Sequence, residues 1–201
     1  METTGDERVT LVAREWRVDG GLLLESLSST GDHHLVIVDD DLGTRAWRFE
    51  NARAGVAIES KLLDGVIVVE GVQSGRPIEE AGRTDETRWL QSLERSLRDF
   101  VLTAADGERL AFVVLQPDTL KVRALQARVH DAEDRVVAGV RTPVRRVRVS
   151  LPGIAAILWR SDYWFRMPDG LFVESRVTRG PPGTRETVVA LVEDTGPAPR
   201  R

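Results

Sequence analysis

The sequence predicts a mainly β fold of the α+β type, in which a curved antiparallel sheet or incomplete barrel wraps around one main helix at about residues 86–101. The first sign is a succession of short segments rich in β-branched and aromatic residues, which favour strands. The second is a set of Asp-Gly pairs between or beside these segments, because Asp-Gly is favoured in tight hairpin turns. The pairs are Asp19-Gly20, Asp64-Gly65, Asp106-Gly107 and Asp169-Gly170.

The expected strands follow one another along most of the chain. Residues 146–151 alternate between polar and apolar side chains, which predicts a strand with one buried and one solvent-exposed face. The runs at 66–69 and 154–158 are apolar on both faces, so something has to cover their second face. The segments expected as strands are 8–18, 21–30, 34–39, 44–50, 55–63, 65–73, 109–116, 144–151, 153–160, 162–167, 171–178 and 187–194.

The helix expected at 86–101 is the best cover for these strands. Its apolar side chains recur at helical spacing, while its charged side chains fall elsewhere. Thr84 or Asp85 is a suitable cap for its first turn. The apolar positions are Leu90, Leu93, Leu97, Phe100 and Val101.

Residues 118–139 admit two interpretations. A helix fits the three-and-four spacing of the apolar residues, with Asp118 as N-cap and Gly139 as stop. A pair of strands needs the inward-facing phase to switch between Ala124 and Leu125, which a β-bulge achieves. We favour strands, because they continue the hairpin rhythm seen on either side of this segment.

The composition is that of a folded globular protein, with 41% apolar and 30% charged residues in a chain of 201. We expect one half-barrel-like domain over residues 1–195 and a disordered tail at 196–201. The net charge of −4 argues against general polyanion binding, so no nucleic-acid partner is expected. No apolar run is long enough for an integral membrane segment. The start lacks a signal-peptide pattern, which predicts a cytoplasmic location, or a periplasmic one if the chain has been trimmed.

Two motifs suggest a bound cofactor or metal, and each fails at an essential position. Residues 179–187 approach the phosphate-binding loop of nucleotide hydrolases, but Arg185 stands where glycine belongs and Glu186 replaces the lysine. Residues 39–50 space their acidic side chains like a calcium loop, but Thr44 stands where the turn needs glycine. The absence of cysteine excludes thiolate zinc sites. No cofactor and no metal are therefore expected.

No catalytic residues are expected either. His33 and His34 are adjacent, so on a strand they point to opposite faces and do not chelate together. No serine has the spacing of a nucleophile elbow, which leaves a hydrolase as the less favoured class. The basic stretch from residue 141 to 148 is interpreted as a charged sheet surface, because Arg145 and Arg146 face opposite ways.

Aromatic residues concentrate between Trp159 and Phe172. They are interpreted either as core or as the lining of a cavity for an apolar ligand. We expect Trp159 to lie in the core and Trp164 to line the cavity, because Trp164 lies near the turn at Asp169. The candidate ligand-binding residues are Trp164, Tyr163, Phe172, Trp89, Leu93 and Leu97.

Three motifs carry a family resemblance: residues 89–97, "QPDTLKV" at 116–122, and "YWF" followed by "PDG" and phenylalanine at 163–172. On these motifs the chain resembles a bacterial family of uncharacterised proteins. In layout alone it is also similar to the periplasmic carriers of lipoproteins, in which an incomplete barrel curls around a helix. That resemblance implies an apolar concavity able to shelter an acyl chain.

The leading hypothesis for function is a non-catalytic binding or carrier protein, which holds an apolar or lipid-like ligand between the curved sheet and the helix. The alternative is a structural or protein-interaction module, whose core is filled and whose sheet edge pairs with a partner or with a second copy in a homodimer. A dry, closed core beside the helix would count against the carrier.

Overall fold

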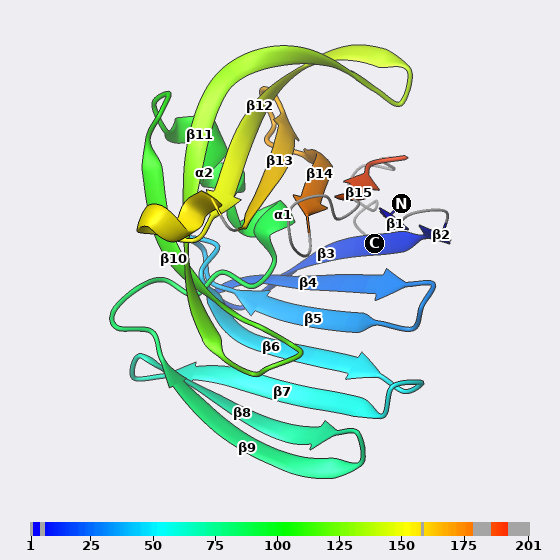
Figure 1. Cartoon of the computed structure of the whole chain (residues 1–201), viewed down its shortest axis with the longest axis vertical. Coiled ribbons are helices and arrows are strands. Elements are labelled where there is room, and N and C mark those ends of the chain that lie inside the picture. The colour runs from blue at the N-terminus through cyan, green and yellow to red at the C-terminus, as the bar shows by residue number, and fades with distance from the viewer. Residues whose placement is uncertain (1, 5–6, 158, 179–185, 193–201) are drawn as a thin grey trace.

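The computed structural model describes residues 2–4, 7–157, 159–178 and 186–192. They form two antiparallel sheets in a curved, open arrangement with two short helices inside the curve (Figure 1), which confirms the predicted fold class. Of the helices in these ranges, none is long and apolar enough to cross a membrane. The tail expected at 196–201 lies outside the described residues.

The lower sheet, named from its place in Figure 1, is a meander of seven strands in chain order. Each strand pairs with the next, so the sequence order is also the spatial order. Its strands are β3 (Leu11–Val18), β4 (Gly21–Ser28), β5 (His33–Val38), β6 (Thr44–Asn51), β7 (Val56–Leu63), β8 (Val66–Gln73) and β9 (Arg76–Arg83).

The upper sheet has the order β10-β11-β12-β13-β14-β15-β1-β2. Only Thr10 separates β2 from β3, so the chain passes directly from one sheet into the other. The two sheets do not close into a barrel, because the edge strands β9 and β10 are not hydrogen-bonded to each other. The strands of the upper sheet are β1 (Glu2–Thr4), β2 (Glu7–Val9), β10 (Arg109–Leu115), β11 (Val122–Val137), β12 (Val140–Ser150), β13 (Arg160–Arg166), β14 (Phe172–Thr178) and β15 (Glu186–Ala190).

Three of the four Asp-Gly pairs connect consecutive strands, as predicted. Asp64 and Gly65, between β7 and β8, have φ angles of 48° and 75°, and the favoured hairpin turn requires positive φ at both positions. The fourth pair, at 106–107, connects helix α2 (Arg98–Thr103) to β10. The prediction of a hairpin at that pair is therefore wrong.

In place of the single helix predicted at 86–101, the structure has two short helices, α1 (Leu93–Ser96) and α2, separated by Leu97. The helical segment therefore begins seven residues later than predicted. Asp85 and Glu86 have φ angles of 48° and 62°, which an α-helix does not accommodate. The segment after them is extended, and the Leu90 N–H donates to a β10 carbonyl at 2.9 Å. These backbone groups bind the edge of β10, so they do not form the first turns of a helix.

The strand interpretation of residues 118–139 is confirmed by the long strand β11. The pairing with β12 shifts between Val129 and Ala132, so the bulge contains His130 and Asp131. It does not lie between residues 124 and 125, where the pairing of β10 with β11 is continuous. The long strand accommodates its apolar side chains on both faces, because different cores lie on either side of it.

The strand expected at 153–160 is wrong in its first half, which forms the 3₁₀ turn η1 (Gly153–Ile157). Gly153 has a φ of 64°, so the backbone turns away from the sheet immediately after Pro152. Strand β9 is not predicted by the sequence, because "RPIEEAGR" contains few apolar residues and includes a proline.

Two apolar cores occupy the inside of the curve. In the first, Leu97 of the helical segment packs with Phe165 of the upper sheet, and both are fully buried. In the second, Trp47 of the lower sheet is the largest buried residue of that sheet. Strand β10 contributes to both cores, because successive side chains point to opposite faces: Phe112 joins the first and Val113 the second.

Candidate anion-binding face

The structure distributes the six predicted ligand-binding residues over three clusters. The first core holds four of them together, namely Leu93, Leu97, Tyr163 and Phe172. Trp89 belongs to the second core, where its Nε1–H donates to Gln91 at 2.8 Å. Trp164 lies in a third cluster, on the other face of the upper sheet from Tyr163. Contact of these residues with a ligand stays a prediction.

Among the hollows on the surface of the described part of the chain, two are well enough formed to consider, and neither of them is lined by a residue of α1 or α2. The larger, of about 280 Å³, lies beside Gly43 and the segment 84–89. Its wall is mixed, with Leu62 and Trp89 beside polar side chains, and Asp39 Oδ1 and Arg88 Nη2 approach there to 3.6 Å. The second hollow, of about 240 Å³, lies on the outer face of the upper sheet and has a basic lining.

The basic lining comes from a row of charged side chains that crosses the upper sheet. Directly opposite residues on neighbouring strands point to the same face. The register places Arg109, Arg128, Arg148, Asp162 and Arg176 opposite one another in that order, across β10 to β14. We call these five residues the arginine row. Neighbouring strands lie about 4.8 Å apart, so like charges are held close together, which is destabilising unless anions compensate them.

Only part of this charge is compensated within the protein. Arg148 donates two hydrogen bonds to the Asp162 carboxylate, at 2.9 and 3.0 Å. Arg176 donates to Glu174 at 2.7 Å. Arg109 and Arg128 have no carboxylate partner in the described ranges. Two of the four guanidinium groups therefore keep their hydrogen-bond donors for another ligand.

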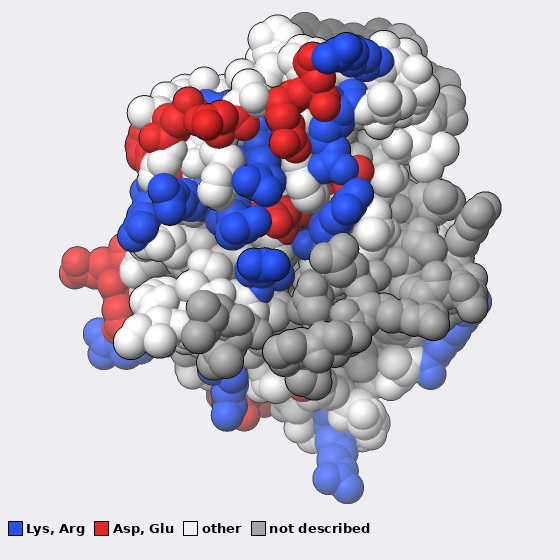
Figure 2. Space-filling view, turned by 45° about the horizontal axis from the view of Figure 1, so that its top comes forward, with Lys and Arg blue, Asp and Glu red and all other residues white. Residues whose placement is uncertain are grey.

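The hollow opens beside this row, between β10, β11, β12 and η1. Gln126 and Ser150, the next opposed pair on β11 and β12, add a neutral amide and a hydroxyl to its lining. Gly153 and Ala156 of η1 form the remaining wall. Basic side chains gather on the face of the upper sheet that comes forward in Figure 2, with acidic side chains beside them. Guanidinium groups with neutral donors between them are suited to binding an oxyanion.

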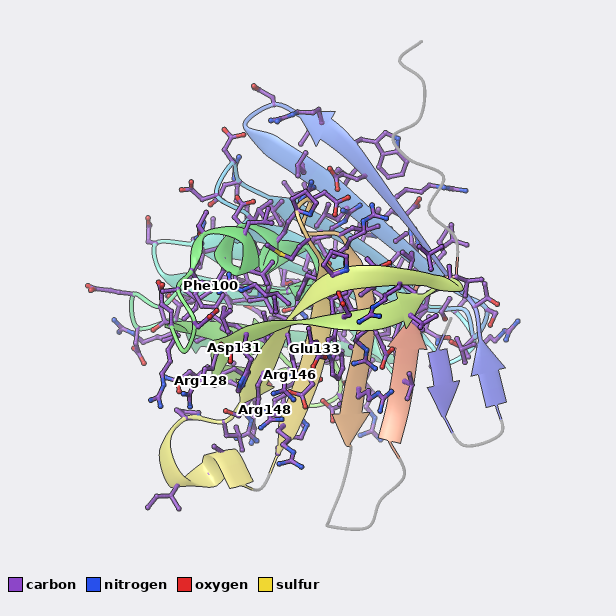
Figure 3. The ribbon with its side chains drawn as sticks, turned by 90° about the horizontal axis from the view of Figure 1, so that it is seen from above. Phe100, Arg128, Asp131, Glu133, Arg146 and Arg148 are labelled. Carbon is purple, nitrogen blue, oxygen red and sulfur yellow. The ribbon has the colours of Figure 1, made fainter. Side chains whose placement is uncertain are left out.

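Next to the arginine row, two buried polar atoms have no hydrogen-bond partner: Arg146 Nε and His130 Nε2. Arg128, Arg146 and Arg148 lie together on β11 and β12 (Figure 3). Burial is the main cause that lowers the pKa of His130, and the charges of Arg146, Arg148 and Arg128 lower it further. Burial and the cations that make this face basic therefore both disfavour protonation of the imidazole.

Trp164 lies on β13 directly opposite Arg146. Its Nε1–H donates to Glu133 at 2.6 Å, and the guanidinium carbon of Arg135 lies 4.1 Å from the ring centroid. Both contacts come from the β11–β12 hairpin, which arches over this side of the molecule (Figure 1). Trp164 is 5% exposed. The hairpin therefore covers the residue that was expected to line a cavity mouth.

The acidic residues of the loop at 39–50 and the histidine pair at 33–34 make contacts within the protein that stabilise its fold. The Asp39 carboxylate accepts two backbone N–H groups of its own turn, at 3.0 and 2.7 Å. His33 and His34 point to opposite faces as predicted, since His33 contacts Glu25 at 3.0 Å while His34 stacks on aromatic rings inside the curve. No group of three or more metal-ligating side chains is found among the residues that the structure describes. Most of the segment 179–187 lies outside them.

The sequence predicts that Arg146 and Arg148 belong to a charged sheet surface, and it does not single out Arg109 or Arg128. The available signal was alternation, which places arginines of the segment 145–148 on two faces. That signal does not reveal the row, because its members come from hairpins far apart in the sequence.

Comparison with known proteins finds little similarity. No family model matches the chain, and the search of curated proteins finds no match. Among solved structures, the chain is similar to a β-barrel-like protein of a domain of unknown function, DUF1849, from Brucella abortus. The two share 14% sequence identity over 90% of this chain and 93% of that chain, with a TM-score of 0.48.

Proposed function

We propose that this protein is a non-catalytic binding module that holds an oxyanion, such as the phosphoryl or carboxylate group of a small molecule, on the outer face of its upper sheet. The observation that carries the proposal is the arginine row beside the hollow. Three arginines line the hollow, and Asp162 compensates only one of them. The lining and the neighbouring Asp162 together therefore carry a net charge of +2, which a dianion neutralises.

Electrostatics favours the bound state. Without a ligand, Arg109, Arg128 and Arg148 are opposed like charges, and such cross-strand pairs are destabilising. An oxyanion between them removes this repulsion and accepts charge-assisted hydrogen bonds, which are about twice as strong as neutral ones. The binding free energy thus includes relief of a strain that the free protein already contains.

A small ligand fits this face better than a nucleic acid does. The chain has a net charge of −4, and Asp131 and Glu133 lie on the same hairpin as Arg128 (Figure 3). These carboxylates repel a long polyanion that extends beyond the hollow. A volume of about 240 Å³ accommodates one small anionic group rather than a backbone of many phosphates.

A carrier of an apolar ligand between helix and sheet has less support. Leu97, Val101 and Phe165 are fully buried between the helices and the upper sheet. An acyl chain placed there has to displace these side chains, which pack at the density of a protein interior. The apolar ligand therefore requires a second, opened conformation, whereas the oxyanion needs none.

The test is calorimetric titration with inorganic pyrophosphate in chloride buffer. The wild-type protein is expected to give saturable heat, and Arg128→Gln is expected to weaken binding about tenfold, which corresponds to about 1.4 kcal/mol. Arg76→Gln is the matched control, because Arg76 is exposed on β9 in the other sheet, and it is expected to bind as the wild type does. Absence of saturable heat, or equal weakening by both substitutions, would refute the proposal.

A further inference from the structure

Strand β3 has an unpaired edge. It pairs with β4 on one side, and along its second edge no described strand is bonded to it. Its side chains from residue 12 to 18 are exposed, including Val12 at 45% and Trp16 at 43%. An exposed strand of this kind is a template for pairing with another chain. The opposite edge of the sheet, β9, is protected by Pro77 and by charged side chains.

The hairpin geometry determines which backbone groups of β3 are free. Val18 and Gly21 flank the two-residue turn and form the closing pair of the hairpin. Hydrogen-bonded and non-bonded pairs alternate along an antiparallel ladder. Trp16 therefore bonds to β4, while the N–H and C=O groups of Glu15 and Arg17 point toward the open edge.

We propose that this edge binds a second copy of the chain, with two β3 strands antiparallel about a twofold axis at Trp16. A twofold axis perpendicular to the sheet keeps the faces equivalent, so it passes midway between one residue of β3 and the same residue of the second copy. A centre at Arg14, Glu15 or Arg17 sets that residue against the same charge. The centre at Trp16 instead sets Glu15 against Arg17 of the second copy, twice over. Among the residues of β3, Trp16 is the centre that opposes two strand residues of opposite charge, so charge complementarity favours this register.

The chosen register also covers apolar surface. Trp16 lies against Trp16 of the second copy in a non-hydrogen-bonded pair, where side chains are closest. Leu23 and Ile37 continue the same row across β4 and β5, and Ile37 is 38% exposed. Glu15 is already oriented by Arg95 of α1, at 2.9 Å. Its carboxylate has the capacity to accept a second guanidinium. The interface is independent of the arginine row, which lies on the other sheet.

Single cysteines test the register directly, because the chain contains no cysteine of its own. Trp16→Cys places two thiols on the twofold axis, where paired Cα atoms are about 4.5 Å apart, within the range of a disulfide. Arg14→Cys is the control, because residue 14 of the two copies is offset by four positions, or about 13 Å. Mild oxidation is expected to cross-link Trp16→Cys at least tenfold faster. Equal rates, or no cross-link at residue 16, would overturn the proposal.

Charge exchange provides the second test without removing Trp16. Sedimentation of the full chain over a range of concentrations is expected to show that Glu15→Arg and Arg17→Glu each reduce the dimer fraction. The double variant carries the pair in reverse and is expected to restore it. A wild-type chain that stays monomeric at all concentrations contradicts the interface, and so does a double variant that is no better than the single ones. Circular dichroism checks that each variant is folded.

Discussion

Arg145 and Arg146 are neighbours in the sequence with entirely different surroundings. Arg145 faces inward, where its Nη1 donates to the Val101 carbonyl at 2.7 Å. Arg146 faces outward and keeps a buried Nε without a partner. Alternation along a strand predicts this difference, and the prediction is confirmed. It does not predict that Arg128 and Arg148 are opposed, because strand register depends on the pairing of the whole hairpin.

His130 is the residue whose titration reports on this face. Its pKa is lowered in the folded protein, first by burial and then by Arg146, Arg148 and Arg128. In the unfolded chain His130 has the ordinary histidine pKa of about 6.5, so near and below that pH the unfolded chain binds more protons than the folded protein. The free energy of unfolding therefore falls as the pH drops from about 6.5 toward the lowered pKa of the folded protein. We expect His130→Asn to reduce this loss, measured by denaturant unfolding at pH 7 and pH 5.5.

His34 contributes a loss of the same sign, because burial lowers its pKa too, so the His130→Asn curve is expected to flatten only in part. Nuclear magnetic resonance separates the two residues. Bound pyrophosphate is expected to raise the pKa of His130, since it offsets the neighbouring guanidinium charges, and to leave that of His34 unchanged. A His130 pKa at or above the ordinary value in the free protein contradicts the account.

The helical segment shows what periodicity does and does not predict. Leu93, Leu97 and Val101 are buried at helical spacing, as expected. Leu90 shares that spacing and is buried as well, but in an extended segment that bonds to β10. The spacing of apolar residues therefore predicts which side chains are buried. It does not predict where the helix begins, because that depends on backbone groups before residue 93 that hydrogen-bond to β10. The positive φ of Glu86 is not encoded by its residue type.

Replacing Leu97 tests whether the space beneath the helices is filled. Leu97 is fully buried and belongs to the first core. Leu97→Ala is therefore expected to lower the free energy of unfolding by about 2–5 kcal/mol. Leu63→Ala is the matched control, because Leu63 is 55% exposed on β7, and it is expected to cost about 0.5 kcal/mol or less. Chemical denaturation measures both. A small effect at Leu97 would indicate a partly open cavity and favour the apolar carrier.

At the scale of the molecule, the sequence predicts the class of fold but not the use of its surfaces. Hairpin turns and strand composition are local, so the antiparallel curved sheet follows from them. The division into two sheets at Thr10 does not follow, because β1 pairs with β15 from the other end of the chain and β2 pairs with β1. The predicted cavity depends on how β10 and the helices fill the curve. The arginine row likewise exists only after the strands are in register.

Crystals soaked in tungstate test the anion site most directly, because tungstate is a heavy dianion that can be located by its anomalous scattering. The account predicts the strongest anomalous density in the hollow bounded by Arg109, Arg128 and Arg148, and its loss in crystals of Arg128→Gln. Density confined to other places on the molecule, or density that persists unchanged in Arg128→Gln, would contradict it.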